Sequence, residues 1–194
     1  MIAVIDTGGA NLASVTNAIN RLDKAWQLTT DSQFIQSADH VLLPGVGAAK
    51  KNWQTLKDFG LDELVLSLKQ PVLGICVGMQ LLFQKSEEGP TPCLGLIDGN
   101  VTHFDNRELI VPHMGWNQVA YRQDSPLFRG IKENSYFYFV HSYRGTDLNY
   151  ACATAEYGGT FAATVQKDNF FGTQFHPEKS GPQGAKLLEN FFAL

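Results

Sequence analysis

Three short apolar runs in the first half of the chain each end at a glycine or proline turn and lead into residues at helical spacing. The runs are residues 2–6, 40–43 and 71–75. Continuous apolar runs of this length are typical of strands buried on both faces of a parallel sheet. Helical spacing follows each run, in residues 12–22, 53–68 and 78–84. The alternation predicts an α/β fold with a mostly parallel central sheet flanked by helices, and Gly60 divides the second helical region.

The second half of the chain has a different pattern. Runs rich in aromatic and β-branched residues, separated by turn residues, lie at 117–121, 136–140, 151–155, 161–165 and 170–175. They predict an antiparallel extension of the sheet. Residues 182–192 predict a closing helix, and no repeat, low-complexity tract or linker interrupts the chain. We therefore expect a single domain over residues 1–194.

Composition and charge exclude several classes of function. Apolar residues make up 44% of the chain and charged residues 18%, as in ordinary folded proteins. The net charge of −4 and the scattered basic residues argue against nucleic-acid and anionic-membrane partners. No apolar run approaches the roughly 20 residues that span a bilayer, and the N-terminus lacks the pattern of a signal peptide. Three cysteines, an odd count, favour free thiols in a reducing compartment, so we expect a cytoplasmic protein.

One of the cysteines lies between two glycines, where the third apolar run turns into a helix. The stretch G-I-C-V-G, residues 74–78, has the G-x-nucleophile-x-G form of a sharp strand-to-helix turn. Such a turn holds Cys76 in a strained conformation at the carboxyl end of a strand, where α/β proteins bind ligands. The start of the next helix favours the thiolate, which is the reactive form. The alternative is a small buried cysteine between glycines that serve close packing.

A cysteine nucleophile needs a base, and His176 is the best placed of the five histidines. It follows the run 170–175, so it can face a cysteine at the end of an earlier strand. Glu178 lies two residues further on, and residues i and i+2 of an extended segment point to the same side. Its carboxylate can therefore orient the imidazole and stabilise the imidazolium. The alternative is a solvated turn after a strand.

Acyl chemistry also needs N–H donors for the oxyanion of the tetrahedral intermediate. The backbone amide of Val77, directly after the nucleophile, is one candidate. The loop P-G-V-G, residues 44–47, ends a neighbouring strand and offers a second donor at Val46 or Gly47, because its glycines let a peptide group turn. Taken alone, the same loop is a simple strand-to-helix turn.

With P-G-V-G, G-I-C-V-G-M-Q and H-P-E in this order, the chain resembles the class I (triad-type) glutamine amidotransferases over essentially its whole length. The resemblance implies a flavodoxin-like architecture. The stretches L-P-G-V-G, V-P-H-M-G-W-N, Y-F-V-H-S-Y and Q-F-H-P-E-K-S-G resemble the glutaminase subunits of imidazole glycerol phosphate synthase, an enzyme of histidine biosynthesis. The first loop, D-T-G-G-A-N, departs from the commoner D-Y-G-x-G-N of those subunits.

The resemblance implies a role for each matching residue. Cys76 would attack the side-chain amide of glutamine to give a γ-glutamyl thioester and ammonia. His176 would deliver the proton to the leaving ammonia and then activate water, and Glu178 would orient the His176 ring. Positions that match the glutamine site are Gly45, Gln80, His141, Ser142 and Tyr143. Positions that match the partner-facing surface are Asn11, Trp116 and Lys179. The implied partner is a (βα)8-barrel cyclase, which uses the ammonia to make imidazole glycerol phosphate and AICAR.

The sequence shows no pattern for a cofactor or a metal. The first loop lacks the lysine and hydroxyl residue of a P-loop, and Cys93 and Cys152 lack the spacing of zinc ligands. We therefore expect no cofactor and no metal. Two other functions stay open, a free-standing thiol amidase or γ-glutamyl hydrolase on the same fold and a catalytically silent regulatory subunit. Gln80 and the stretch His141-Ser142-Tyr143 argue against the first, and the intact Cys76, His176 and Glu178 argue against the second.

Overall fold

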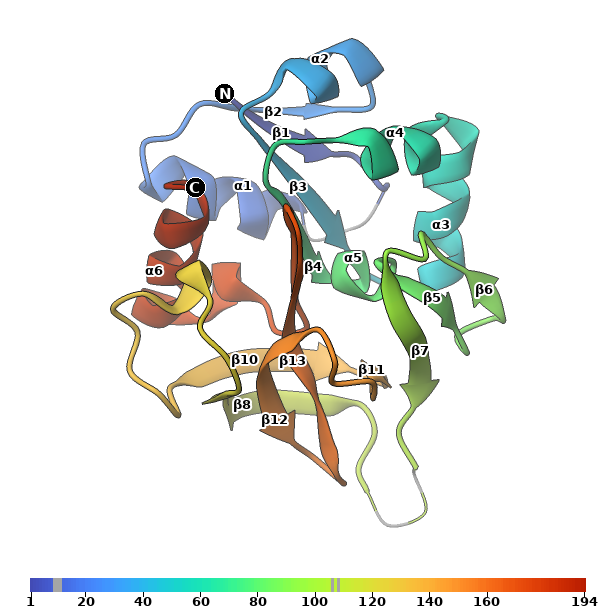
Figure 1. The fold of residues 1–194 in the computed structure, drawn as a ribbon, viewed down its shortest axis with the longest axis vertical. Helices are drawn as coiled ribbons and strands as arrows, with labels where there is room; N and C mark the ends of the chain where they lie inside the picture. Colours follow the sequence, from blue (N-terminus) through green and yellow to red (C-terminus); the bar gives the residue numbers. More distant parts are fainter. Residues whose placement is uncertain (9–11, 106, 108) are drawn as a thin grey trace.

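The computed structural model describes residues 1–8, 12–105, 107 and 109–194 (Figure 1). Within these ranges the main sheet has eight strands, in the order β2 (Trp26–Thr29), β1 (Ile2–Ile5), β3 (His40–Gly45), β4 (Val72–Cys76), β14 (Phe170–Thr173), β13 (Thr160–Lys167), β12 (Ala151–Glu156) and β9 (Ala120–Tyr121). The first five run parallel to their neighbours, and the last three pair antiparallel. The predicted mostly parallel sheet with an antiparallel extension is confirmed.

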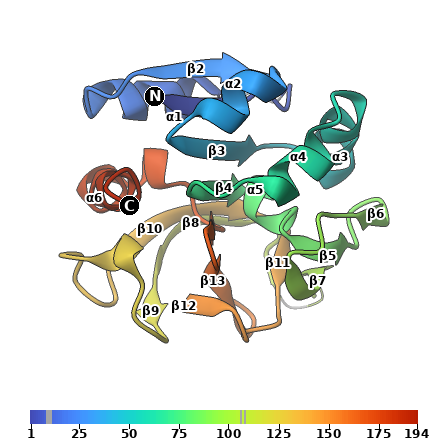
Figure 2. The same cartoon turned by 45° about the horizontal axis from the view of Figure 1, so that its top comes forward.

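Helices cover both faces of this sheet. The helices outside the site are α1 (Leu12–Arg21), α2 (Ser32–Ser37), α3 (Ala49–Asp58), α4 (Leu61–Ser67) and α6 (Gly181–Phe191). Figures 1 and 2 show α1 and α6 on one side of the sheet and α3 and α4 on the other. Because both faces are covered, every residue of β1 and β4 is buried, as the continuous apolar runs predict.

Local sequence explains where the helices begin and end. Asp31 caps α2, since its carboxylate accepts hydrogen bonds from the backbone N–H groups of Gln33 and Phe34 at 2.8 and 3.1 Å. Gly60 separates α3 from α4 with φ of 63°, a left-handed conformation that suits glycine. The predicted division at Gly60 is confirmed.

Two smaller sheets complete the fold. The first pairs β8 (His113–Gln118) with β10 (Tyr136–His141). The second has the order β11 (Tyr143–Gly145), β7 (Ile97–His103), β5 (Phe83–Ser86) and β6 (Thr91–Pro92). Short helical turns lie at α5 (Val77–Gln80), η1 (Pro126–Phe128) and η2 (Pro177–Lys179).

Some predicted elements are wrong. The helix predicted over residues 78–84 ends at Gln80, and Phe83 begins a strand that runs parallel to β7. The buried side chains of Leu81, Leu82 and Phe83 fit a packed strand as well as a helix, so periodicity alone cannot separate the two. Residues 136–140 do form a strand, but it pairs with β8 in a sheet of its own instead of extending the main sheet. Strand β2, helix α2 and strands β5 to β7 were not predicted.

Within the described ranges, no helix reaches the length and apolar character that a membrane span requires.

Candidate active site

Cys76 lies at the sharp turn between β4 and α5. Its backbone has φ of 55° and ψ of −110°, a conformation that costs a non-glycine residue free energy and is found mainly at functional sites. The predicted strained turn is confirmed. Because β4 lies between two parallel neighbours, β3 and β14, the turn puts the sulfur at the carboxyl edge where those strands also end.

The glycines around Cys76 are required by close packing of backbone on backbone. A Cβ atom at Gly78 would lie 1.8 Å from the carbonyl oxygen of Leu43, and one at Gly74 would lie 2.6 Å from the carbonyl oxygen of Gly78. On the neighbouring loop, a Cβ at Gly45 would lie 2.6 Å from the backbone nitrogen of Gly78. The two interpretations of these glycines therefore do not exclude each other. The glycines serve close packing, and this close packing is what allows the sharp turn at Cys76.

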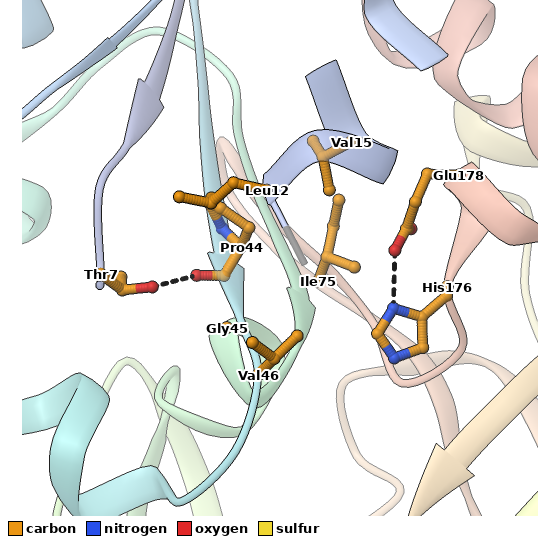
Figure 3. A pocket seen from close by; sticks show the side chains of 9 residues that line it. All are labelled: Thr7, Leu12, Val15, Pro44, Gly45, Val46, Ile75, His176 and Glu178. Carbon is orange, nitrogen blue, oxygen red and sulfur yellow. Dashed lines mark hydrogen bonds and ion pairs between the residues drawn. The ribbon is translucent and has the colours of Figure 1, made fainter. Parts of the chain in front are cut away.

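His176 reaches the same edge because β14 runs parallel to β4 and ends beside it. Its Nδ1 lies 2.7 Å from Oε1 of Glu178, and both residues are buried (2% and 8% exposed), which argues against a solvated turn. The backbone of His176 is held as well, since its N–H donates to the Tyr138 carbonyl at 2.9 Å and its carbonyl accepts from Ser180 Oγ at 2.7 Å. Figure 3 shows the His176–Glu178 pair facing the end of β3.

The electrostatics favour a protonated His176. Burial lowers the pKa of His176, but its hydrogen bonds and charge interactions with Cys76 and Glu178 outweigh burial and raise the pKa to about 10. An imidazolium beside a sulfur stabilises the thiolate, the form that attacks a carbonyl carbon. The three residues can therefore act as nucleophile, proton carrier and orienting carboxylate.

A cleft of about 910 Å³ opens over Cys76. The predicted site residues that line it are Val46, Gly47, Cys76, Val77, Gln80, His141, Ser142, Tyr143, His176 and Lys179. Gly45 and Glu178 instead line a small neighbouring cavity, which His176 and Val46 share (Figure 3). The side chains of Leu12, Val15 and Ile75 in that cavity keep the surroundings of the His176–Glu178 pair apolar. Trp116 lies outside the cleft on β8, and Asn11 lies outside the described residues.

Among the described residues, no group of three or more histidine, cysteine, aspartate or glutamate side chains is arranged so that it could hold a metal ion.

The cysteine elbow, the buried histidine–glutamate pair and the glycine loop all lie within the residues that one family model matches. The family model for glutamine amidotransferase class-I matches residues 3–194. The chain belongs to the class I glutamine amidotransferases.

Amidotransferases from several bacteria are similar to this chain over almost its full length. The imidazole glycerol phosphate synthase subunit HisH of Pasteurella multocida is 50% identical over 98% of this chain and 96% of its own. The subunit HisH 2 of Legionella pneumophila is 50% identical over 100% of this chain and 98% of its own. The HisH subunit of Haemophilus influenzae is 48% identical over 98% of this chain and 96% of its own.

Solved structures of lower sequence identity share the fold. A crystal structure of a glutamine amidotransferase matches with a TM-score of 0.76 at 16% identity, covering 99% of this chain and 97% of the other. PurLQS from Thermotoga maritima matches with a TM-score of 0.73 at 17% identity, covering 99% of this chain and 97% of the other. At these identities the likeness shows the fold alone, and it agrees with the predicted class I architecture.

The loop of this amidotransferase that ends β3 is held by side chains that sequence reasoning missed. Thr7 Oγ1 donates to the Pro44 carbonyl at 3.1 Å. Asn52 Nδ2, on a side chain that is 1% exposed, donates to the carbonyls of Val46 and Ala48 at 3.0 and 2.9 Å. Thr7 thus holds the Pro44–Gly45 peptide group from the β1 end, and Asn52 holds the Val46–Gly47 peptide group from α3, on either side of the Gly45–Val46 peptide group. Thr7 acts on a segment 37 positions further along the chain, so no local pattern marks it, whereas Asn52 reaches back only four and six residues to carbonyls that precede α3.

A chain of buried amides connects Cys76 to the wall of the cleft. Gln80 Nε2 donates to the Tyr143 carbonyl and to Gln174 Oε1, both at 3.0 Å. Gln174, which is fully buried, places its Nε2 3.8 Å from Cys76 Sγ. Gln174 stands in the Q-F-H-P-E-K stretch, but no role for it was predicted. Its burial beside the sulfur is visible only in the fold.

The three thiols should differ in reactivity at neutral pH. Burial raises the pKa of Cys93 to about 12 and that of Cys152 to about 11, so at pH 7 about one Cys152 side chain in ten thousand is a thiolate. We expect iodoacetamide at pH 7 to alkylate Cys76 alone, as read by peptide mass spectrometry. A His176→Asn variant should be alkylated at Cys76 at least about tenfold more slowly, since the imidazolium is removed.

Raising the pH should reduce the difference in alkylation rate between Cys76 and the other two cysteines. Cys152 and Cys93 form thiolate only as the pH approaches their raised pKa values. Alkylation of Cys93 at pH 7 at the same rate as Cys76, or no effect of His176→Asn, would contradict this account.

Proposed function

We propose that this chain is the glutaminase subunit of an imidazole glycerol phosphate synthase in histidine biosynthesis. It hydrolyses glutamine to glutamate and ammonia and passes the ammonia to a (βα)8-barrel cyclase, which makes imidazole glycerol phosphate and AICAR. The observation that carries the proposal is the strained Cys76 beside the buried His176–Glu178 pair. Relatives of about 50% identity with names of this subunit support the choice among amidotransferases.

The reaction follows from the geometry of the three residues. The Cys76 thiolate attacks the side-chain amide carbon of glutamine, and the carbonyl electrons move to its oxygen. The N–H of Val77 and a peptide N–H at Val46 or Gly47 stabilise this oxyanion. His176 gives its proton to the leaving nitrogen, the C–N bond breaks, and ammonia and a γ-glutamyl thioester remain.

Water completes the cycle. His176, now neutral, accepts a proton from water while the water oxygen attacks the thioester carbon. The C–S bond then breaks, glutamate leaves, and Cys76 returns to the thiolate beside an imidazolium. Glu178 stabilises the positive charge on His176 at both stages through the 2.7 Å contact between Oε1 and Nδ1.

The remaining cleft residues are proposed to hold the substrate. Gly45, Gln80, Ser142 and Tyr143 lie on segments that converge on Cys76 from β3, α5 and the β10–β11 connection. Glutamine is small and polar, so recognition requires a few fixed hydrogen-bonding groups in place of a large apolar surface.

An exposed apolar face beside the cleft supports a protein partner. Met114 and Trp116 on β8 and Tyr136 on β10 are 63%, 54% and 53% exposed, and the Trp116 ring lies 6.0 Å from that of Tyr138. Lys179 is exposed and lines the cleft itself. Exposed aromatic and methionine side chains on paired strands are typical of interaction surfaces. We propose that the cyclase docks on this face, with Trp116 and Lys179 in contact with it.

The test is to measure ammonia release from glutamine by the purified chain, alone and with the cyclase, each with and without the nucleotide substrate of the cyclase. We expect low release alone and at least about tenfold faster release in the liganded complex. Uncoupled turnover would waste glutamine and lose ammonia to solvent, so we propose that the Gly45–Val46 peptide completes the oxyanion site only in that complex.

The possible outcomes separate the candidate functions. Equal turnover with and without the liganded partner would contradict the gating. Full activity of the chain alone would support a free-standing thiol hydrolase. No activity in any state, with Cys76 shown to be reduced, would support a silent subunit.

A further inference from the structure

Two buried histidines face each other across the small β8–β10 sheet, and the proposed reaction uses neither as a proton carrier. His113 opens β8 and pairs in register with His141 at the end of β10. They are 5% and 6% exposed, and His113 Nδ1 lies 2.9 Å from His141 Nε2. A direct imidazole–imidazole hydrogen bond in the core requires one ring to donate and the other to accept.

The surroundings of the two rings disfavour the protonated, charged form of either imidazole. His113 stacks on Tyr157 at 4.1 Å between ring centroids and on Phe139 at 5.1 Å. Phe104 and Phe161 each lie 5.2 Å from the His141 ring. Burial in this aromatic box lowers the pKa of His113 to about 4 and that of His141 to about 3. At neutral pH both imidazoles are therefore neutral, and each carries one N–H and one lone pair.

One backbone carbonyl then decides the tautomer of both rings. His141 Nδ1 lies 2.7 Å from the Tyr143 carbonyl oxygen, which can only accept, so Nδ1 carries the proton and Nε2 is the acceptor. His113 must in turn donate from Nδ1, which leaves its Nε2 as an acceptor. Asn117 meets that requirement, since its Nδ2 lies 3.3 Å from His113 Nε2. The hydrogen bonds run in one direction, from Asn117 through His113 and His141 to Tyr143.

The Tyr143 carbonyl is the point where this relay meets the active site. It accepts from His141 Nδ1 and also from Gln80 Nε2 at 3.0 Å, so both of its lone pairs are engaged. Gln80 continues through Gln174 to Cys76 Sγ. The backbone of Ser142 and Tyr143, which lines the cleft, is thereby tied on one side to the nucleophile and on the other to β8.

We propose that His113 is a positioning residue for the glutamine site, acting through His141 to hold the Ser142–Tyr143 wall of the cleft. The proposal rests on the function proposed above. Both ring nitrogens of His141 are engaged within the protein, so His141 supports the wall in place of the direct substrate contact that the family resemblance implies. Loss of the His113 donor frees His141 Nε2 and lets the ring adopt the other tautomer, which cannot donate to Tyr143.

A matched pair of variants separates positioning from packing. His113→Phe keeps the stacked ring and removes the donor, whereas His113→Asn keeps an N–H close to the position of Nδ1 and removes the ring. The readout uses the isolated chain and two reagents that alkylate Cys76, iodoacetamide and a diazo-ketone analogue of L-glutamine. The first reports the thiol, and the second also needs the glutamine site.

We expect the ratio of the two rates, analogue over iodoacetamide, to fall about tenfold in His113→Phe. In His113→Asn it should stay within about threefold of the unmodified chain, even if that variant melts at a lower temperature. An unchanged ratio in His113→Phe, or an equal fall in both variants, would overturn the proposal.

Two further measurements keep the result clear if a variant folds poorly. ¹⁵N NMR of the unmodified chain should show both His113 and His141 protonated at Nδ1, and a His141 protonated at Nε2 would overturn the proposal by itself. If the analogue labels the unmodified chain no faster than its D-enantiomer does, the glutamine site itself fails, whereas an enantiomer preference as large in His113→Phe as in the unmodified chain contradicts only the role of His113.

Discussion

Cys76→Ala should reduce glutamine-dependent synthesis by the complex with the cyclase by at least about a thousandfold and leave ammonia-dependent synthesis within about twofold. The thioester cannot form without the sulfur, and nucleophile removal commonly costs a factor of this size or larger. Ammonia supplied from solution bypasses the missing step. Alanine also fits the site, because it replaces a 5% exposed side chain with a smaller one.

The measurement is product formation by the complex with either nitrogen source at saturating nucleotide substrate. Cys93→Ala is the matched control, since Cys93 is half-buried and lies outside the residues that line the cleft, and it should leave both activities intact. Loss of the ammonia-dependent reaction in Cys76→Ala would show that the cysteine is structural. Retention of the glutamine-dependent reaction would refute its role as nucleophile.

Gly78→Ala should destabilise the protein by about 3 kcal/mol or more. Its Cβ would lie 1.8 Å from the Leu43 carbonyl oxygen and 2.9 Å from the carbonyl carbon, so the main chain of β3 or α5 has to move. Neither can shift freely, because β3 is hydrogen-bonded between β1 and β4 in the centre of the sheet. The same displacement would move the Val77 amide, so glutamine hydrolysis should fall together with stability.

Urea unfolding, followed by circular dichroism, measures the effect. The control is Gly60→Ala, where the added Cβ meets nothing within 4 Å and the cost of about 1 kcal/mol comes only from the left-handed backbone. Equal destabilisation by the two variants would mean that the elbow relaxes easily and that Gly78 is not required for its geometry.

The parts of the fold that sequence could predict are those coded by neighbouring residues. β1, β3 and β4 are continuous apolar runs, and their covered faces explain why no polar alternation interrupts them. β2 was missed because Trp26, Gln27 and Leu28 are partly exposed on the edge of the sheet and form no apolar run. The strand at Phe83 was taken as helix because three consecutive buried side chains fit either element.

In the candidate active site, too, the features that the sequence could predict lie within short stretches of the chain. The elbow at Cys76 spans five residues, and the pair of His176 and Glu178 spans three. Motif order and family resemblance then brought the two together. The residues that support them were not predicted, since Gln174 meets Cys76 across 98 positions of the chain and His113 meets His141 across 28.

By itself, therefore, the sequence determined the alternating architecture and the family, and it indicated the residues that we propose as nucleophile and proton carrier. Each depends on short-range backbone chemistry, in which a glycine, a proline or an apolar run restricts its neighbours. Only the tertiary structure decided that Thr7 holds the loop after β3 from the end of β1, which tautomer the paired histidines adopt and which strand face stays exposed beside the cleft. Those features depend on hydrogen bonds between segments far apart in the chain, and their partners become visible only when the segments are packed together.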